Sequence, residues 1–206
     1  MSTSVRQELR DYTVLAGEGK GEEEYLITRL ECYSPPLTIV NSYGEQEKVG
    51  KEEQEERWGR LRKEMEDIRA RGELCLLLGD QNKHVGSDHL GVEGNHSRVS
   101  RGGHLVRELL ATGDWFMVNS MGREVVEGGP FTRKDPASGK LSCLQLFIVS
   151  KELKPFVRKL FIDSGRSWGV ARPVFEKGSF RLVHTDHFPC LLTLDGLHWK
   201  GKGAEK

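Results

Sequence analysis

Residues 74–82 read LCLLLGDQN, and this stretch decides the fold class. The unbroken apolar run from Leu74 to Leu78 follows a helical segment directly, which predicts a strand buried on both faces of a sheet. The run ends in Asp80 and Asn82, whose side chains point the same way if the backbone stays extended. Because α/β folds place their chemistry at strand ends, the stretch predicts an α/β protein with a functional site there.

A second cluster of polar residues precedes the last apolar run of the chain. Asp186 and His187 add a carboxylate and an imidazole to the set that Asp80 and Asn82 begin. A carboxylate and an amide near a histidine suit a hard cation that holds a phosphate. Taken alone, Gly79 to Asn82 also fits an ordinary turn of the kind that Asp and Gly form.

The segment before residue 74 is the clearest helix. The sequence predicts it over residues 51–71, with Gly72 as the glycine that ends it. Its apolar residues fall on one face at helical spacing and predict core packing: Trp58, Leu61, Met65 and Ile68. A shorter apolar set predicts a second helix over residues 103–112, and this set consists of Leu105, Val106, Leu109 and Leu110.

The remaining apolar runs are short and read as strands. They lie at residues 24–33, 37–41, 115–118, 144–149, 160–162, 180–183 and 190–194. The order of helices and strands predicts an α/β (α+β) fold, a mixed-sheet β-sandwich flanked by helices. We expect one domain over residues 24–195. A polar, Gly- and Glu-rich segment over residues 1–23 and a tail over 196–206 are expected to be flexible.

Composition narrows the classes of partner and compartment. The 206 residues carry 31 basic and 31 acidic side chains, so the net charge does not attract nucleic acid. Any contact with nucleic acid would need a local patch of basic residues. The four cysteines lie far apart and form no CxxC pair, which predicts free thiols in a reducing compartment. No run is long enough to span a bilayer. We expect an intracellular protein, cytoplasmic or nuclear, with no membrane partner.

Five short motifs follow one another in a fixed order. They are N-x-Y-G at residues 41–44, G-D-x-N at 79–82, F-T at 131–132, S-x-L-x-L at 142–146 and T-D-H-x-P at 185–189. The series resembles the endonuclease/exonuclease/phosphatase superfamily in both order and spacing. Within it, the chain is most similar to the endonuclease domains of retrotransposons that lack long terminal repeats.

The resemblance implies metal-dependent hydrolysis of DNA phosphodiesters, with Mg²⁺ as the cofactor and DNA as the partner. Asp80 would orient the attacking water with the help of Asn82, and His187 would stabilise the charge on the scissile phosphate. Tyr43 would donate a hydrogen bond to that phosphate. Asp80 and Asp186 would lie at the metal ion.

The turn-rich stretch from Asp135 to Gly139 predicts a hairpin, and residues near it complete the implied site. The side chain of Gln145 occupies the position at which the family carries an aspartate that orients the histidine. Thr132, Arg133 and Lys134 are candidate contacts to nucleic acid, because phosphate contacts need only a local cation or hydrogen-bond donor.

The chain departs from the family pattern in two ways. Nothing before residue 24 is recognisable as the family's first strands, which carry an asparagine and a metal-binding glutamate, so we expect a fold without them. A neutral Gln145 cannot stabilise an imidazolium by charge; in the serine-protease triad the analogous change costs roughly 10⁴ in rate. We therefore expect Mg²⁺ binding to be weak or absent and cleavage to be impaired.

Two further interpretations stay open. The chain is alternatively a catalytically inactive domesticated domain that binds or scaffolds an unknown protein partner, or a transposon-derived reading frame with no settled role. A loop holding His84, Asp88, His89, Glu93 and His96 matches no zinc spacing and reads as solvated surface. The remaining arginines, Arg123 among them, are scattered and read as surface charges.

Overall fold

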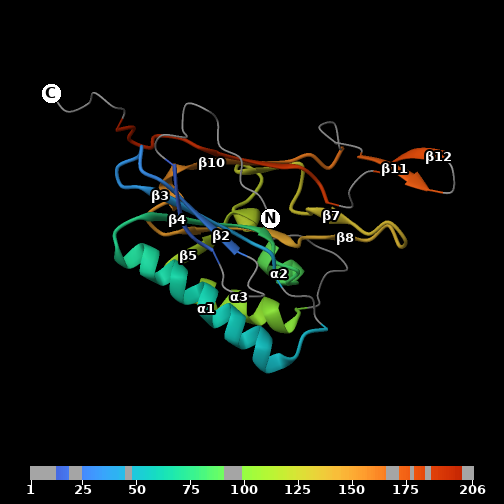
Figure 1. Cartoon of the computed structure of the whole chain (residues 1–206), viewed down its shortest axis with the longest axis horizontal. Coiled ribbons are helices and arrows are strands. Elements are labelled where there is room, and N and C mark those ends of the chain that lie inside the picture. Colours follow the sequence, from blue (N-terminus) through green and yellow to red (C-terminus); the bar gives the residue numbers. More distant parts are fainter. Residues whose placement is uncertain are drawn as a thin grey trace.

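The strands of the computed structural model form two facing layers, and helices cover one outer side (Figure 1). The structure describes residues 13–18, 25–44, 48–90, 99–165, 172–176, 179–183 and 187–200. This arrangement confirms the predicted mixed α/β class. None of the helices in these ranges is both long and apolar enough to cross a membrane.

The larger layer is a six-stranded sheet centred on the stretch at residues 74–80. Its order is β1 (Thr13–Glu18), β2 (Tyr25–Leu30), β3 (Leu37–Ser42), β4 (Leu74–Asp80), β9 (Gln145–Ser150) and β5 (Trp115–Met117). Strands β3 and β4 are parallel, and every other pair in the sheet is antiparallel. The parallel pair places the ends of β3 and β4 at the same edge, where both carry family-like motifs.

Helices α1 (Lys51–Ala70) and α3 (Arg101–Ala111) pack on one face of this sheet. The predicted stripe on α1 is buried: Trp58, Leu61, Met65 and Ile68. These residues share a cluster with Cys75 and Leu77 of β4, so the predicted packing of helix on strand is confirmed. Helix α3 begins where the Ser100 hydroxyl accepts a hydrogen bond from the Gly103 N–H, a side-chain cap.

The opposite face of the large sheet packs on a second, three-stranded sheet. This sheet has the order β13 (Cys190–Leu194), β10 (Val157–Ile162) and β6 (Val126–Glu127). Leu74 and Leu76 of β4 face it, while Cys75 and Leu77 face the helices, since successive side chains of a strand point to opposite sides. Strand β4 is therefore buried on both faces, as its unbroken apolar run predicts.

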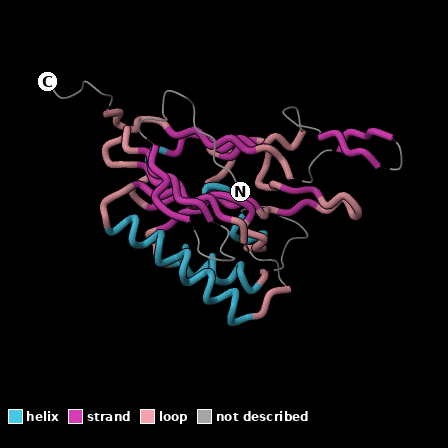
Figure 2. The backbone as a smooth tube through the Cα atoms, in the orientation of Figure 1, coloured by secondary structure: helices cyan, strands magenta, loops and turns pink. Residues whose placement is uncertain are grey.

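Two short hairpins project from one end of the molecule (Figures 1 and 2). One consists of β7 (Arg133–Lys134) and β8 (Leu141–Ser142), at the predicted turn, and the other of β11 (Arg172–Glu176) and β12 (Ser179–Val183). The remaining short elements are α2 (Ser87–Leu90) and the 3-10 helices η2 (Val118–Ser120) and η3 (Lys154–Phe156). The β7–β8 hairpin leads directly into β9, next to the end of β4.

The structure differs from the sequence-based expectation at both ends of the chain. Strand β1 lies within the segment predicted to be flexible, because its main chain pairs with the edge of β2. In the predicted tail, the Lys200 N–H donates to the Cys32 carbonyl at 2.6 Å, and the Trp199 ring meets Tyr33 edge-on. Residues 196–200 thus pack on the body of the protein. The other residues of the two segments lie outside the described ranges.

Candidate active site

Asp80 and His187 meet where the two sheet layers end. Asp80 closes β4 of the large sheet, and His187 lies three residues before β13 of the small sheet. Nε2 of His187 is 3.4 Å from Oδ2 of Asp80, and the two side chains are only 25% and 15% exposed. The structure thus places a carboxylate and an imidazole, far apart in sequence, in contact at one rim of the sandwich.

Two glycines let the ends of β3 and β4 approach each other. Gly79 has φ +128°, and a Cβ there would lie 2.0 Å from the Ser42 carbonyl oxygen. A Cβ on Gly44 would lie 2.1 Å from the Gln81 carbonyl oxygen. The Gly44 N–H donates to the Asp80 carbonyl at 2.7 Å. Neither contact leaves room for a side chain, which explains the glycines of both N-x-Y-G and G-D-x-N.

Asn82 adopts a conformation that the spacing argument does not foresee. Its φ is +49°, in the left-handed region that asparagine tolerates better than most residues. Its Nδ2 donates to the Gly44 carbonyl at 2.8 Å, and its N–H donates to Oδ1 of Asp80 at 3.0 Å. The expectation that Asp80 and Asn82 point the same way along an extended strand is therefore wrong, because the chain turns between them.

Gln145 lies directly across the ladder from Asp80. The two residues are Cα partners between β4 and β9. The polar contact of the Gln145 side chain is with Cys190, whose Sγ lies 3.5 Å from Oε1. Burial raises the pKa of the Cys190 thiol to about 12, so the thiol is protonated and donates. The side-chain amide of Gln145 thus belongs to the cluster around Asp80, and its Oε1 accepts a hydrogen bond from the Cys190 thiol.

Thr132 holds the hairpin against the site. Its side chain is fully buried, and its Oγ1 accepts hydrogen bonds from the N–H groups of Leu144 and Gln145 at 3.0 and 2.9 Å. Its carbonyl accepts from the Phe188 N–H at 2.7 Å. The expectation that Thr132 contacts nucleic acid is corrected here, since a fully buried hydroxyl with these partners positions β9 and the residue after His187.

The other predicted site residues lie near this cluster. Arg133 forms an antiparallel bridge with His187, and the exposed Lys134 follows it in β7. Tyr43 is 40% exposed and precedes Gly44, next to the turn after β4. Asp186 lies outside the described residues. The hairpin therefore brings the main chain of Arg133 beside His187, with Lys134 as the next residue along β7.

Two buried amides in the site have no counterpart among the predicted residues. The Gln81 side chain donates from Nε2 to the hydroxyl and carbonyl oxygens of Ser42, at 2.6 and 3.2 Å. Asn119 donates to the Gln145 carbonyl at 3.2 Å and accepts from the Phe147 N–H at 2.9 Å. Asn119 follows an apolar run, just as Asp80 does. The same sequence signal could therefore have identified Asn119 as a candidate site residue.

The described residues do not form a magnesium site by themselves. Asp80 contributes a carboxylate to the cluster, and its two oxygens already contact His187 and the Asn82 N–H. Across the described ranges, no group of three His, Cys, Asp or Glu side chains converges as a metal site. In the polar loop that begins at His84, Asp88 pairs with Arg107. A hard cation takes several oxygen ligands, and Asp186, the other predicted ligand, lies outside the described residues.

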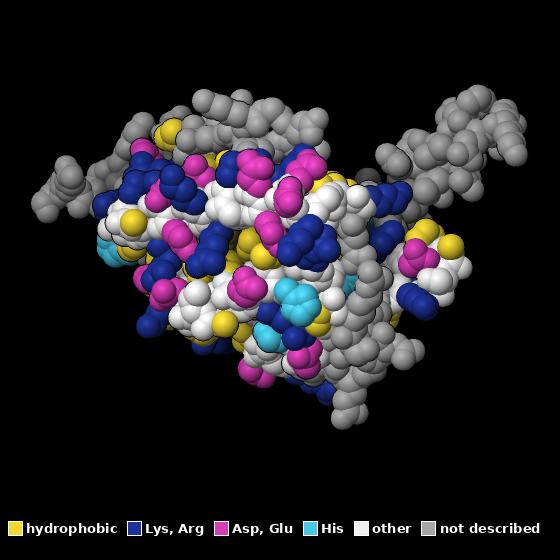
Figure 3. All heavy atoms as spheres, turned by 90° about the horizontal axis from the view of Figure 1, so that it is seen from below, with side chains coloured by type: hydrophobic (Ala, Val, Ile, Leu, Met, Phe, Trp, Pro, Cys, Tyr) yellow, Lys and Arg dark blue, Asp and Glu magenta, His cyan; other side chains and the backbone are white. Residues whose placement is uncertain are grey.

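Charges of both signs are interspersed on the helical face of the molecule (Figure 3). Helix α1 contributes ion pairs at i,i+4 spacing, namely Lys51–Glu55, Arg57–Glu53, Arg60–Glu56 and Arg62–Glu66. Pairs of this kind stabilise an exposed helix and cancel its field. They agree with the zero net charge of the chain, so an anionic substrate would be attracted by local cations rather than by the whole surface.

Solved structures with the same architecture include nucleases. The 3'-5' exonuclease NExo of Neisseria meningitidis superposes with a TM-score of 0.60 at 16% identity, over 89% of this chain and 71% of its own. An AP endonuclease from Archaeoglobus fulgidus gives 0.59 at 13% identity, over 88% and 69%. A Bacteroides thetaiotaomicron protein described as an endonuclease/exonuclease/phosphatase family protein gives 0.54 at 14%, over 90% and 64%. The chain has the endonuclease/exonuclease/phosphatase fold.

Two further structures carry ligands on this fold. NExo has also been solved bound to a product DNA hairpin. A beta toxin of Staphylococcus aureus, solved with bound magnesium ions, gives a TM-score of 0.51 at 14% identity, over 84% of this chain and 58% of its own. No protein-family model and no curated protein matches the sequence.

Proposed function

We propose that the chain is an endonuclease-like domain derived from a retrotransposon of the class without long terminal repeats. Its ancestral reaction is Mg²⁺-dependent hydrolysis of DNA phosphodiesters, and cleavage is impaired in this copy. The contact between Asp80 and His187 carries the proposal, because it joins the two sheet layers on a fold shared with NExo and an AP endonuclease. The order of the five motifs supports the retrotransposon class.

The two side chains have complementary roles toward a phosphodiester. The Asp80 carboxylate accepts a proton from, or orients, a water molecule at the rim. The His187 imidazole, when protonated, donates to a phosphate oxygen on which negative charge develops. A divalent ion, when bound, would neutralise part of that charge. Among the described residues, Asp80 would contribute a carboxylate oxygen to it.

Gln145 is the main reason for expecting slow cleavage. In the described cluster it lies opposite Asp80 and takes a hydrogen bond from the Cys190 thiol. A neutral amide in this place does not stabilise an imidazolium at His187 by charge, as a carboxylate would. The transition state therefore loses electrostatic stabilisation, which is usually the largest single contribution to catalysis.

A plasmid-nicking assay tests the proposal. Purified chain is incubated with supercoiled plasmid in millimolar Mg²⁺ or Mn²⁺, beside Asp80→Ala, His187→Ala and the surface control Lys63→Ala. We expect little nicking, with any residual rate lost in Asp80→Ala and His187→Ala and kept in the control. Robust nicking that the two site substitutions abolish would instead identify a working nuclease.

The alternative is an inactive domain that binds or scaffolds a partner. The neutral Gln145 at the position of the family's aspartate favours it. This alternative predicts no nicking under any condition and unchanged affinity for partners after Asp80→Ala. The nicking assay and a binding measurement on the same variants separate the two functions.

A further inference from the structure

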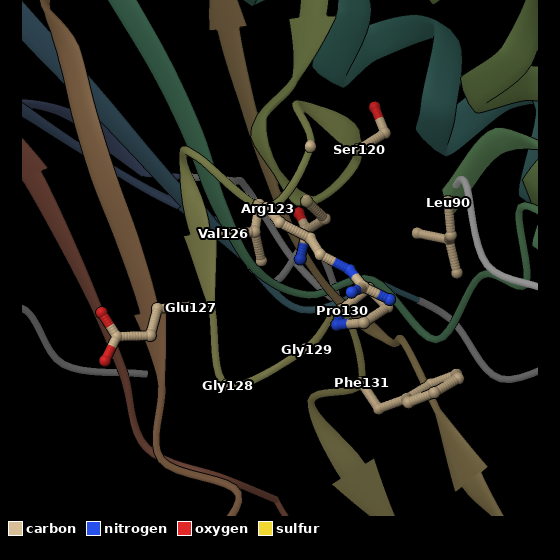
Figure 4. A pocket seen from close by; sticks show the side chains of 11 residues that line it. Leu90, Ser120, Arg123, Val126, Glu127, Gly128, Gly129, Pro130 and Phe131 are labelled. Atoms are coloured by element: carbon tan, nitrogen blue, oxygen red, sulfur yellow. The ribbon is translucent and has the colours of Figure 1, made fainter.

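A cavity of about 890 Å³ opens beside the candidate active site, and Asn119, which bonds the Gln145 carbonyl, is part of its lining. Its walls come from η2, from Leu90 at the end of α2, and from the loop that runs from Gly122 to Phe131 (Figure 4). This volume lies in the range of pockets that hold small organic ligands.

The cavity adjoins the rim at which Asp80 and His187 meet. Phe131 lines it, and the next residue, Thr132, holds Gln145 and Phe188 through hydrogen bonds. Arg133, one residue further, bridges to His187. Phe131, Thr132 and Arg133 thus connect the wall of the cavity to the main chain of His187, which places the cavity next to the rim.

The lining combines a cation with apolar surface. Arg123 extends its guanidinium into the cavity toward Pro130 and Phe131 (Figure 4). The acidic side chain of the lining, Glu127, is paired with Lys159, so Arg123 is the charge that faces the ligand. Leu90, Val126 and the Phe131 ring supply the apolar walls.

A pair of glycines shapes the floor. A Cβ on Gly128 would lie 1.9 Å from the Ile162 carbonyl oxygen, so the loop touches β10 there. A Cβ on Gly129 would meet nothing within 4 Å, because that position borders open space. Both have φ +88°, which glycine adopts without strain. The main chain of this loop therefore forms an open wall free of side chains opposite the cation.

We propose that this cavity binds the base of a nucleotide, with the Phe131 ring against the base and the Arg123 guanidinium toward its phosphate or its π face. Aromatic rings and arginine are the groups on which unpaired bases stack. The proposal rests on the proposed function, since it places the base beside the phosphate held at the rim. It names a nucleotide unit, which either a DNA strand or a free nucleotide can supply.

Binding in EDTA tests the cavity without cleavage. The probes are a fluorescein-labelled single-stranded DNA octamer and a matched octamer whose central nucleotides are abasic, with dAMP and inorganic phosphate as competitors. The variants are Phe131→Ala, Phe131→Leu and Arg123→Gln, with Arg60→Gln on α1 as the matched control. Thermal melting checks that each variant is folded, and Phe131→Leu keeps apolar volume if the alanine variant does not fold.

We expect the wild type to prefer the base-containing octamer about tenfold, as loss of stacking on an aromatic ring predicts. Phe131→Leu should remove most of that preference, Arg123→Gln should weaken both octamers, and Arg60→Gln should change neither. Displacement by dAMP but not by phosphate identifies a free nucleotide as sufficient, whereas displacement only by unlabelled DNA identifies the strand. Two outcomes would overturn the proposal. The first is equal affinity of the wild type for the two octamers. The second is that Arg123→Gln and a folded Phe131→Leu variant both bind the octamers as the control Arg60→Gln does.

The proposed base-binding site and the proposed cleavage reaction can be tested independently. Asp80→Ala leaves the lining intact, so the preference for bases should persist in this variant even if no nicking is ever observed. A preference that Phe131→Leu removes, together with an absence of nicking, would retain the base site and reject residual catalysis. Nicking that requires His187, together with equal octamer binding, would do the reverse.

Discussion

At the scale of single residues, Gly44 and Gly79 are fixed by close contacts between β3 and β4. Gly44→Ala would drive a methyl group against the Gln81 carbonyl, so we expect a loss of about 2 kcal/mol or more in the free energy of unfolding. Gly59→Ala is the matched control, because a Cβ at this position of α1 meets nothing within 4 Å. This control should gain roughly 0.5–1 kcal/mol from helix propensity. Urea unfolding of both variants measures the two changes, and equal effects would contradict the assigned contact.

Gln145 is the residue whose replacement most directly tests the impaired site. Gln145→Asp restores a charge across from Asp80, and the wild-type side chain is a neutral acceptor for the Cys190 thiol. We expect the nicking rate to rise about tenfold or more, because a carboxylate stabilises an imidazolium. Gln145→Asn, which is equally short and stays neutral, should not raise it. A rate that Gln145→Asp leaves unchanged, with nicking present, would show that this side chain does not act through His187.

The residue types of the site were readable from the sequence, and their conformations were not. Asp80, Asn82 and His187 stand out because each lies beside an apolar run. The left-handed turn at Asn82 depends on a hydrogen bond to Gly44, 38 residues earlier in the chain. The burial of Thr132 likewise depends on β9 and on Phe188. Spacing along a chain carries no information about such partners.

At the scale of elements, α1 contributes one wall of the core. Trp58→Ala removes a side chain that is 5% exposed, and we expect it to cost roughly 3–5 kcal/mol through lost burial and a residual cavity. Lys63→Ala, on the exposed side of the same helix, should change stability by less than about 0.5 kcal/mol. Chemical denaturation of the two variants provides the comparison. A cost below about 1 kcal/mol for Trp58→Ala would mean that this face does not pack on β4.

The end of α1 is tied to the end of β9 by charge. Arg69 donates to Glu152 at 2.8 Å and to Asp114 at 3.3 Å. The hydrogen bond from Arg69 lowers the pKa of Glu152 to about 2, from 4.5. This contribution to stability is present above pH 4.5 and is lost as the pH falls toward 2. Glu152→Gln should therefore flatten the fall in melting temperature over this window. The effect should be small, because the Glu152 side chain is half exposed.

Helices and strands with a clear apolar pattern were predicted from the sequence. Strands that form only by pairing with a neighbouring strand were not. The helix stripe of α1 and the apolar run of β4 each bury a face, so their patterns appear in the sequence. Strand β6 has two residues and exists because it lies beside β10. Strand β1 pairs with β2 in a segment whose composition indicates disorder. Such strands are stabilised by backbone pairing with an existing sheet, which no local pattern records.

At the scale of the whole molecule, the site exists only because two layers pack together. Asp80 comes from the six-stranded sheet and His187 from the approach to the three-stranded one. The resemblance of the motifs predicted that these two residues, 107 positions apart in the sequence, share one site. The periodicity of apolar residues carries no information about that contact. The cavity beside them was not predicted from the sequence, because its lining combines residues of α2, η2 and β6 with Arg123, which the sequence marks only as a surface charge.

The charge balance of the whole molecule sets how its nucleic-acid binding should respond to salt. Basic and acidic side chains are equal in number, so the surface as a whole should not attract DNA. We expect about three phosphate contacts near the site, from Arg123, Arg133 and Lys134. Each contact to a single strand contributes about −0.7 to the slope of log affinity against log salt concentration, so the expected slope is about −2.

Raising KCl from 50 to 200 mM should then weaken binding of the octamer roughly 20-fold. A protein that makes six to ten phosphate contacts loses about 10³–10⁵ over the same range. Fluorescence anisotropy across a KCl series gives the slope, and Lys134→Gln should make it shallower by about 0.7 while Arg60→Gln leaves it unchanged. A slope steeper than about −4 would require basic residues beyond these three, and the surface would then bind DNA by bulk charge despite its neutral total.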